Sequence, residues 1–324
     1  MSSNNCQLSV MEKTELVNNQ AGIKSRSNTV SENNNKEFAF IAQNAASNQL
    51  ARAMTIKLDN IDRFGHGQLT VKGFCLSFKN YRHYINTNGP VGVSAAKLLD
   101  VLLIQATADG LNNTLVTLPL KEYMSMRRLK NEDQTRQQAK RDIDALKSIS
   151  YKYEGDKSWF EVALWGGFSA QNEKGGLFFR FSEEFFNSFK VHGKYIVMYL
   201  PLNALCLNDN AHPYSYWFAR KIAEHKHLNF NKPTENIIST KTLTKPQNCP
   251  TFPTYEEVMA TDRALTRRII KPFERDMNAL EDDFLWEYIN GKPAHYRDFI
   301  MKHIQIYWRN YPPKSMGSKQ QKGG

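Results

Sequence analysis

The chain has 324 residues, a formal net charge of +11 at pH 7 and a hydrophobic content of 41%. This length is long for one domain and natural for two, and the composition allows sizeable cores. The excess of Lys and Arg favours a polyanionic partner, either nucleic acid or an anionic membrane surface, although an ordinary basic enzyme carries the same kind of charge.

The sequence argues against membrane, disulfide and metal chemistry. No apolar run reaches the roughly 20 residues needed to span a bilayer, and the opening MSSNNCQLSVMEKTEL lacks the basic-then-apolar layout of a signal peptide. The four cysteines have no paired spacing, and no GxxxxGKS or GxxxxGKT phosphate loop is present. We therefore expect a cytoplasmic protein with no cofactor, no bound metal and no membrane partner.

The first 50 residues are rich in Asn, Ser and Gln and poor in large apolar residues. This composition predicts a mostly disordered polar tail, residues 1–50. Within it, FAFIAQNAASNQLARAM allows an amphipathic helix that begins near Lys36. Organised sequence is expected from about Thr55.

Three helices and a strand are predicted between residues 94 and 148. VSAAKLLDVLLIQATADG has helical spacing, with Ser94 as its N-cap and Asp109-Gly110 as its end. LVTLPL predicts a short strand, and Pro119 lies near the first turn of a second helix. The third helix, residues 132–148, buries a stripe of Thr135, Ala139, Ile143 and Leu146. Gln137, Lys140, Arg141 and Asp144 fall on the opposite side, and Arg136 and Lys147 flank the stripe.

A β-hairpin is predicted directly after the third helix. SISYKYEG and SWFEVALWGG alternate like strands, with a turn at residues 154–157, and GLFFRF predicts a further strand. The order helix, strand, helix, helix, hairpin is that of a winged helix, in which the third helix enters the major groove.

The same order recurs in the second half of the chain. HPYSYWFARKIAEHKHLNF predicts a helix, and a later helical stretch buries a stripe of Leu265, Ile269, Phe273, Met277 and Leu280. FLWEYI and HIQIYW supply strands, whereas Pro272 predicts a kink or a break in the helix. We therefore predict an α+β fold of tandem winged-helix domains at residues 51–207 and 208–324, whose sequences show no obvious repeat.

The chain resembles plasmid replication initiator proteins with two winged-helix domains, the iteron-type initiator family, over roughly residues 55–311. The resemblance lies in VSAAKLLDVLLIQA, RQQAKRDIDALKSISYKY, FFRFSEEFFNSFKVHGKYIVMYLPL and LTRRIIKPFERDMNAL. The family tolerates a proline inside its second recognition helix. It implies binding to repeated sites in double-stranded origin DNA, DNA melting, recruitment of host replication proteins such as a helicase or initiator, and dimers that repress their own promoter.

Two sets of basic and amide side chains are candidates for DNA contact. Arg and Gln form bidentate bonds with guanine and adenine edges, so Gln137 and Arg141 are expected to read bases, whereas Arg127, Arg128 and Lys130 grip phosphate. Lys152 and Lys157 would add phosphate contacts from the hairpin. The complete set is Arg127, Arg128, Lys130, Gln134, Arg136, Gln137, Lys140, Arg141, Lys152, Lys157, Arg263, Arg267, Arg268, Lys271 and Arg275. The alternative is a solvated helix face, diluted by Asp142 and Asp144.

Two other classes of DNA-binding protein, a nicking nuclease and a transcriptional repressor, are also compatible with a basic chain of this kind. A rolling-circle nicking nuclease needs a His-hydrophobic-His metal pair, and the sequence offers only His225-Lys226-His227, where the central cation opposes metal binding. The simpler explanation is that these residues form the C-terminal end of a helix, where the negative end of the helix dipole favours cations. A transcriptional repressor would carry the same DNA-binding residues as an initiator. We expect a protein that binds DNA without catalysis.

Overall fold

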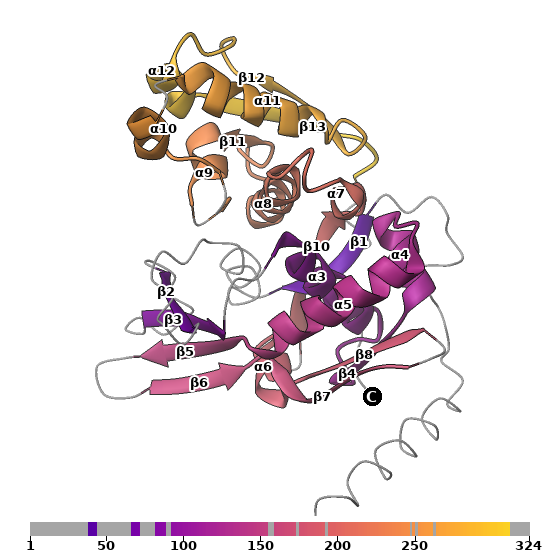
Figure 1. Ribbon diagram of the computed structural model, residues 1–324. Helices are drawn as coiled ribbons and strands as arrows, with labels where there is room; N and C mark the ends of the chain where they lie inside the picture. Colours follow the sequence, from indigo (N-terminus) through magenta and orange to yellow (C-terminus); the bar gives the residue numbers. More distant parts are fainter. Residues whose placement is uncertain are drawn as a thin grey trace, which may run out of the picture. The chain divides into compact units, whose positions relative to one another are not determined.

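The structure is a computed structural model (Figure 1), which describes residues 38–43, 66–71, 82–88, 92–154, 159–172, 175–191, 194–246, 248–249, 252–261 and 264–311. All of these belong to one unit, residues 37–324. Helices and strands both build the fold, which confirms the α+β class. Among the described helices, none has both the length and the apolar character that crossing a bilayer requires.

The predicted helices of the first half are confirmed. They are α3 (Val93–Ala108), α4 (Leu120–Arg127) and α5 (Glu132–Lys147), and the strand β4 (Leu115–Pro119) lies between α3 and α4. The N-cap of α3 is Gly92 and makes no side-chain hydrogen bond. The expectation that Ser94 caps this helix is therefore wrong: its hydroxyl instead donates to Asp142 Oδ2 of α5 at 2.7 Å.

The hairpin that pairs with β4 is not the predicted one. β4 joins β8 (Gly176–Phe181), and β8 also pairs with β7 (Trp165–Gln171), which gives the sheet order β4-β8-β7. Val116 lies opposite Phe179, and Leu118 lies opposite Leu177; all four side chains are buried. The strand predicted across residues 158–167 is interrupted at Leu164, which is fully buried and belongs to neither β6 nor β7.

The predicted hairpin exists but belongs to a second sheet. β5 (Ser150–Glu154) and β6 (Trp159–Ala163) pair antiparallel. β5 continues the sheet to β3 (Arg82–Asn88) and then β2 (His66–Val71), with the order β2-β3-β5-β6. In the chain, β5 and β6 therefore lie between α5 and the β7–β8 hairpin, as an addition to the predicted order, whereas β2 and β3 precede α3.

The amphipathic helix expected from Lys36 is a strand instead. β1 (Phe38–Gln43) pairs antiparallel with β10 (Lys194–Pro201) along its whole length, and β10 also pairs with the short β9 (Lys190–Val191). Ile41 and Ala42 are buried, so this part of the predicted tail is integral to the core. The rest of that tail lies outside the described residues. Two short helices, α6 (Glu183–Asn187) and α7 (Asn203–Cys206), complete this half.

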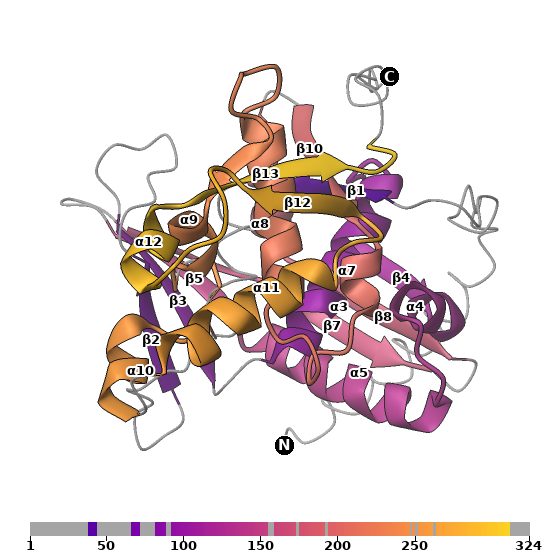
Figure 2. The ribbon, with the colours of Figure 1, turned by 90° about the horizontal axis from the view of Figure 1, so that it is seen from above.

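The second half follows a similar order to the first, with additional helices. α8 (Ser215–Leu228), β11 (Ile237–Ser239) and α9 (Thr240–Thr244) are followed by α10 (Tyr255–Thr261) and a helical segment that starts at Thr266. β12 (Phe284–Tyr288), α12 (Tyr296–Met301) and β13 (His303–Trp308) follow. Of these, α10 is an additional helix before the counterpart of the third helix, and α12 lies between the last two strands. The sheet order is β11-β13-β12, which again puts the first strand beside the last. Figure 2 shows β12 and β13 side by side, with α11 next to them.

Pro272 lies in the counterpart of the third helix, which changes its helical form there without the break that the sequence allowed. The π-helix η2 (Thr266–Ile270) passes directly into α11 (Lys271–Asn278), in which Pro272 lies in the first turn. The Lys271 amide donates to the carbonyl oxygen of Thr266, five residues back. Since proline has no amide hydrogen, the wider turn satisfies the backbone around a position that an α-helix cannot accommodate. Four of the five residues of the predicted apolar stripe, Ile269, Phe273, Met277 and Leu280, are buried, and Leu265 is half-buried against the core.

Candidate nucleic-acid interface

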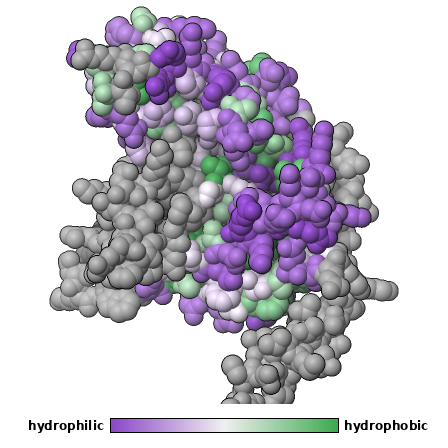
Figure 3. Space-filling view, in the orientation of Figure 1, coloured by the Kyte–Doolittle hydropathy of each residue, from purple (hydrophilic) through white to green (hydrophobic). Residues whose placement is uncertain are grey.

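The helix α5 separates its side chains as the sequence predicts. Thr135, Ala139, Ile143 and Leu146 are buried, whereas Gln137, Lys140, Arg141 and Asp144 are exposed. Hydrophilic residues cover the region of Figure 3 where Figure 1 shows α5. The helix is a rigid support for these groups, because Asn131 Oδ1 accepts from the Gln134 amide at 2.9 Å and caps its N-terminus.

Four of the predicted contact side chains of α5 are available for a ligand. The side chains of Gln134, Gln137, Lys140 and Arg141 have no hydrogen-bond, ion-pair or ring partner within the part of the chain that the structure describes. Arg136 differs, since its guanidinium pairs with Glu132 at 2.5 Å and its side chain is 27% exposed. An internal ion pair would compete with a phosphate for this guanidinium, so Arg136 is a weaker candidate for DNA contact than Lys140 and Arg141.

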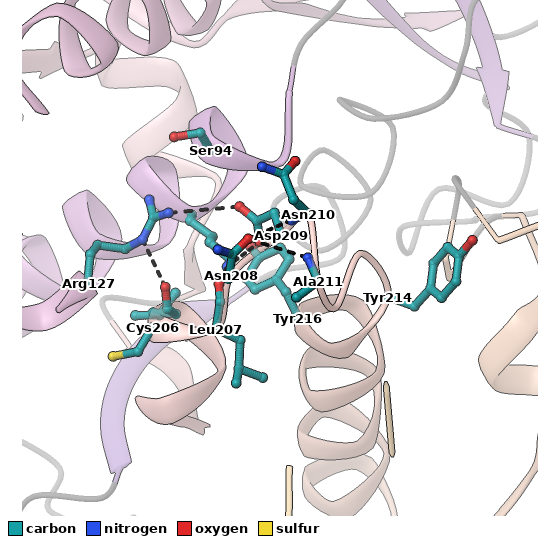
Figure 4. Close-up of polar contacts among 12 residues, drawn as sticks. Ser94, Arg127, Cys206, Leu207, Asn208, Asp209, Asn210, Ala211, Tyr214 and Tyr216 are labelled. Atoms are coloured by element: carbon teal, nitrogen blue, oxygen red, sulfur yellow. Dashed lines mark hydrogen bonds and ion pairs between the residues drawn. The ribbon is translucent and has the colours of Figure 1, made fainter. Parts of the chain in front are cut away.

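Arg127 does not take the role expected for it. Its side chain is buried, its Nε donates to the Leu205 carbonyl at 2.8 Å, and its Nη1 donates to the Tyr123 hydroxyl at 3.0 Å. Its Nη2 lies 3.9 Å from Asp209 Oδ2, and Figure 4 shows the guanidinium directed toward this residue. The last turn of α4 turns this side chain into the core, and Arg127 therefore joins α4 to the α7–α8 connection instead of gripping phosphate.

Arg128 and Lys130 remain on the surface. Arg128 ends α4 in the left-handed conformation, with φ of 49°, and donates to Asn203 Oδ1 at 3.3 Å. Lys130 is exposed just before the N-cap of α5. A phosphate beside the start of α5 would meet both this lysine and the positive end of the helix dipole.

The second set of cations lies on η2 and α11. Arg267, Arg268, Lys271 and Arg275 are all exposed. Arg275 is 47% exposed, and its Nε donates to Asp276 Oδ1 at 2.6 Å, which orients its guanidinium. Arg263 and Lys157 lie outside the described residues, and Lys152 lies on β5, with no description of its side chain.

The structure adds a cation that sequence reasoning missed. Arg180 is exposed on β8, and its guanidinium lies 5.7 Å from the centre of the Phe168 ring on β7. Its position was readable in GLFFRF, where Arg180 alternates with the buried Phe179 and Phe181. The predicted wing is the β5–β6 hairpin, so the predicted contact residues do not include Arg180 on β8.

Two ionisable side chains, Lys97 and Asp142, are buried beneath the surface of this half. Lys97 of α3 is fully buried and donates to the Leu207 carbonyl at 2.9 Å and to Asp209 at 2.5 Å. Burial lowers the pKa of this lysine, although Asp209 opposes the shift. Burial also raises the pKa of the Asp142 carboxyl, while hydrogen bonds from Ser94 and Gln138 oppose that shift.

The histidine pair considered for a nuclease is engaged in local contacts. His225 Nε2 lies 3.0 Å from the Thr234 carbonyl, and its Nδ1 lies 3.2 Å from Asn229 Nδ2. Lys226 is buried and donates to Glu235 and Asn236. Within the described ranges, no group of three His, Cys, Asp or Glu side chains is placed to hold a metal ion.

The fold has known counterparts, although sequence comparison finds none. A crystal structure of selenomethionine derivatives of domain 2 and domain 3 of RctB matches with a TM-score of 0.50 and 9% identity, over 82% of this chain and 99% of that one. A second crystal structure of RctB domains 2–3 gives a TM-score of 0.40 and 10% identity, over 81% of this chain and 97% of that one. No family model and no curated protein matches the sequence. At these identities the likeness concerns the fold.

Proposed function

We propose that this protein initiates DNA replication by binding double-stranded origin DNA through two winged-helix modules, without catalysis of its own. The observation that carries the proposal is the exposed face of α5, where Gln137, Lys140 and Arg141 have no partner among the described residues. The likeness to RctB, a replication initiator of a chromosome origin, supports initiation as the role.

Each module would use its third helix in the major groove and its hairpin on the flanking backbone. In the first module the β7–β8 hairpin is the wing, because it is the hairpin that pairs with β4, and Arg180 is its cation. Arg141 and Gln137 are the base-reading candidates, since their side chains match guanine and adenine edges. Lys130, Lys140 and Arg128 supply phosphate contacts.

The second module would place η2 and α11 in another major-groove segment. Lys271 and Arg275 are exposed there, and Arg267 and Arg268 add charge from the π-helical turn. The two modules would then engage two successive groove segments about one helical turn apart. Repeated origin sites, a plasmid replicon, homodimers, host helicase or initiator partners, and a cytoplasmic location complete the proposal, as the resemblance implies.

Binding is tested with a double variant and a charge-matched control. Lys140→Ala with Arg141→Ala removes two cations from α5, while Lys232→Ala with Arg309→Ala removes two from exposed positions outside both third helices. The ligand is a duplex selected by the wild-type chain from random sequences. We expect the α5 variant to lose about 2–5 kcal/mol of specific binding, and the slope of log K against log salt to shrink by about 0.9 for each lost phosphate contact. Equal effects of the two variants would remove α5 from the interface.

The initiator role needs a separate test, because a repressor would bind in the same way. A plasmid that carries the selected site and lacks any other origin should replicate only when the wild-type protein is supplied, and not with the α5 double variant. Site-specific binding without replication would favour a repressor. Nicking of supercoiled DNA that depends on Mg²⁺ or Mn²⁺ would instead favour a nuclease.

A further inference from the structure

The two third helices share a short sequence that the chain as a whole does not repeat. RDIDAL occupies residues 141–146 of α5, and RDMNAL occupies residues 275–280 at the end of α11. The burial pattern agrees at all six positions: exposed, buried, buried, exposed, half-buried and buried. The second position of each is an aspartate, at 4% exposure for Asp142 and 0% for Asp276.

Asp142 ties α5 to the start of α3. Its Oδ2 accepts from the Ser94 hydroxyl at 2.7 Å, and its Oδ1 accepts from Gln138 Nε2 at 2.9 Å. Ser94 is the second residue of α3, and Figure 4 shows it on this helix. The bond therefore joins the third helix of the first half to the N-terminus of its first helix.

Asp276 makes the corresponding connection in the second half. Its Oδ2 accepts from the Tyr214 amide at 2.6 Å, and its own carbonyl accepts from the Ser215 hydroxyl at 2.8 Å. Tyr214 is the N-cap of α8, and Ser215 is its first residue. In both halves, the aspartate of the shared sequence thus binds a serine or an amide at the start of the first helix.

Holding two helices together with a buried carboxylate costs desolvation free energy. Burying such a group is costly unless its hydrogen bonds are made, and a Leu or Ile at the same place would pack without that penalty. A hydrogen bond is directional, however, whereas apolar packing allows a helix to rotate slightly. An arginine head lies roughly 8 Å from its helix axis, so a rotation of 20° moves it by on the order of 3 Å, which is as long as a hydrogen bond.

We propose that Asp142 and Asp276 are positioning residues that fix the rotation of the two third helices, so that Arg141 and Arg275 occupy equivalent places over two DNA segments. The proposal rests on the proposed DNA-binding function and adds the residues that set its specificity. Arg141 and Arg275 directly precede the two aspartates, and both are exposed. Equivalent placement of two arginines favours the same base, guanine, at the matching point of each segment.

The test uses Asp142→Ala against Asp144→Ala, which removes a carboxylate from an exposed position of the same helix. Alanine is chosen because an asparagine oxygen could still accept from the Ser94 hydroxyl. Binding is measured to the selected duplex and to its complete set of single-base-pair substitutions. The position read by Arg141 is the one at which Arg141→Ala loses its preference. We expect Asp142→Ala to lose about 5- to 150-fold of discrimination at that position and to keep the salt slope of the wild type. Asp144→Ala should discriminate as the wild type does.

Further variants separate positioning from plain stability. Ser94→Ala cuts the same hydrogen bond at its other end and should reproduce the loss at the same base pair. Asp142→Leu keeps the branched arrangement of four side-chain heavy atoms without the directional bond, so it should fold and still discriminate poorly. Arg141→Ala combined with Asp142→Ala should discriminate no worse than Arg141→Ala alone, because the aspartate acts through the arginine. Asp276→Ala should give the matching loss at the position read by Arg275, from which Asp276 also accepts a hydrogen bond directly.

The outcomes distinguish this proposal from the one on which it rests. A wild-type chain that selects no duplex refutes DNA binding and the positioning role together. A wild-type chain that binds selectively, with Asp142→Ala discriminating equally well, refutes only the positioning role. Uniform weakening on every duplex, in proportion to lost folding stability, also refutes it.

Discussion

The ion pair between Asp100 of α3 and Arg220 of α8 is deeply buried. We therefore expect replacement of one partner to lower the free energy of unfolding strongly, and replacement of both partners to lower it only slightly. Arg220 Nη1 lies 2.5 Å from both carboxylate oxygens of Asp100, and the Tyr216 hydroxyl donates to Oδ2 at 2.7 Å. The two side chains are 1% and 0% exposed. Burial alone would lower the pKa of Arg220, yet Asp100, Tyr216 and Glu224 together outweigh this and the pKa rises, so the guanidinium stays charged.

The expected free energies follow from this geometry. At 2.5 Å and an effective dielectric constant of about 20, the attraction between the charges is about 7 kcal/mol. Removing two ions from water costs several kcal/mol for each, so the pair contributes little net stability. Arg220→Met leaves Asp100 without its counter-charge and should lower the free energy of unfolding by about 3–5 kcal/mol. Asp100→Leu added to Arg220→Met should recover most of that loss.

The assay is urea unfolding followed by circular dichroism, on the wild type, both single variants and the double variant. Similar m-values across the four proteins would show that the same surface unfolds in each. The matched control is Arg136→Met on α5, whose ion pair with Glu132 at 2.5 Å is open to solvent, with side chains 27% and 48% exposed, so it should change stability by less than about 1 kcal/mol. A double variant as unstable as the sum of the singles would refute the reasoning.

Two further predictions concern single positions. Gly175 has φ of +83° and a Cβ there would lie 3.3 Å from the Arg136 side chain, so Gly175→Ala should lose about 1–2 kcal/mol, whereas Gly92→Ala, with nothing within 4 Å, should be close to neutral in the same thermal melts. Burial lowers the pKa of Lys97 below 10.5, so between that lowered pKa and about 10.5 the unfolded chain holds this proton more tightly, and the contribution of Lys97 to stability rises with pH. Buried tyrosines such as Tyr216 and Tyr288 have raised pKa values and act in the opposite direction in the same range. Lys97→Met should therefore make stability fall more steeply with alkaline pH than in the wild type, measured by urea unfolding, and an unchanged slope would contradict the assignment.

The spacing of apolar residues along the sequence correctly predicted the helices that bury one apolar face and expose the opposite one. The stripe of α5 and the stripe that ends in Leu280 are both confirmed, because a helix that covers a core shows its period of about 3.6 in the sequence. The strand β1 could not be found in this way. Ile41 and Ala42 are consecutive and both buried, so FAFIAQ lacks the alternation of a half-exposed strand. Its pairing with β10 is a long-range property that no local window contains.

The candidate interface was predictable as a face but not residue by residue. Charge and period indicated which side of α5 meets solvent, and Lys140 and Arg141 lie there. SMRRLK, in contrast, contains adjacent arginines of similar chemistry. Only the end of α4 separates them, since Arg127 turns into the core and Arg128 takes the left-handed conformation outside it. The wing can be identified only when it is known which hairpin pairs with β4. The sequence of neither hairpin determines this pairing, because it is a long-range contact.

The shared RDIDAL and RDMNAL segments show where the two halves agree and where they diverge. The agreement covers the C-terminal part of each third helix, which Asp142 and Asp276 hold against the first helix. Upstream, α5 continues as an α-helix, whereas η2 is a π-helix that inserts extra residues per turn before Pro272. The cations of η2 therefore cannot lie in phase with Gln134 and Gln137 of α5. Since N-terminal residues of a recognition helix usually contact base edges, we expect two half-sites with one base pair in common and different flanks, in contrast to a perfect repeat.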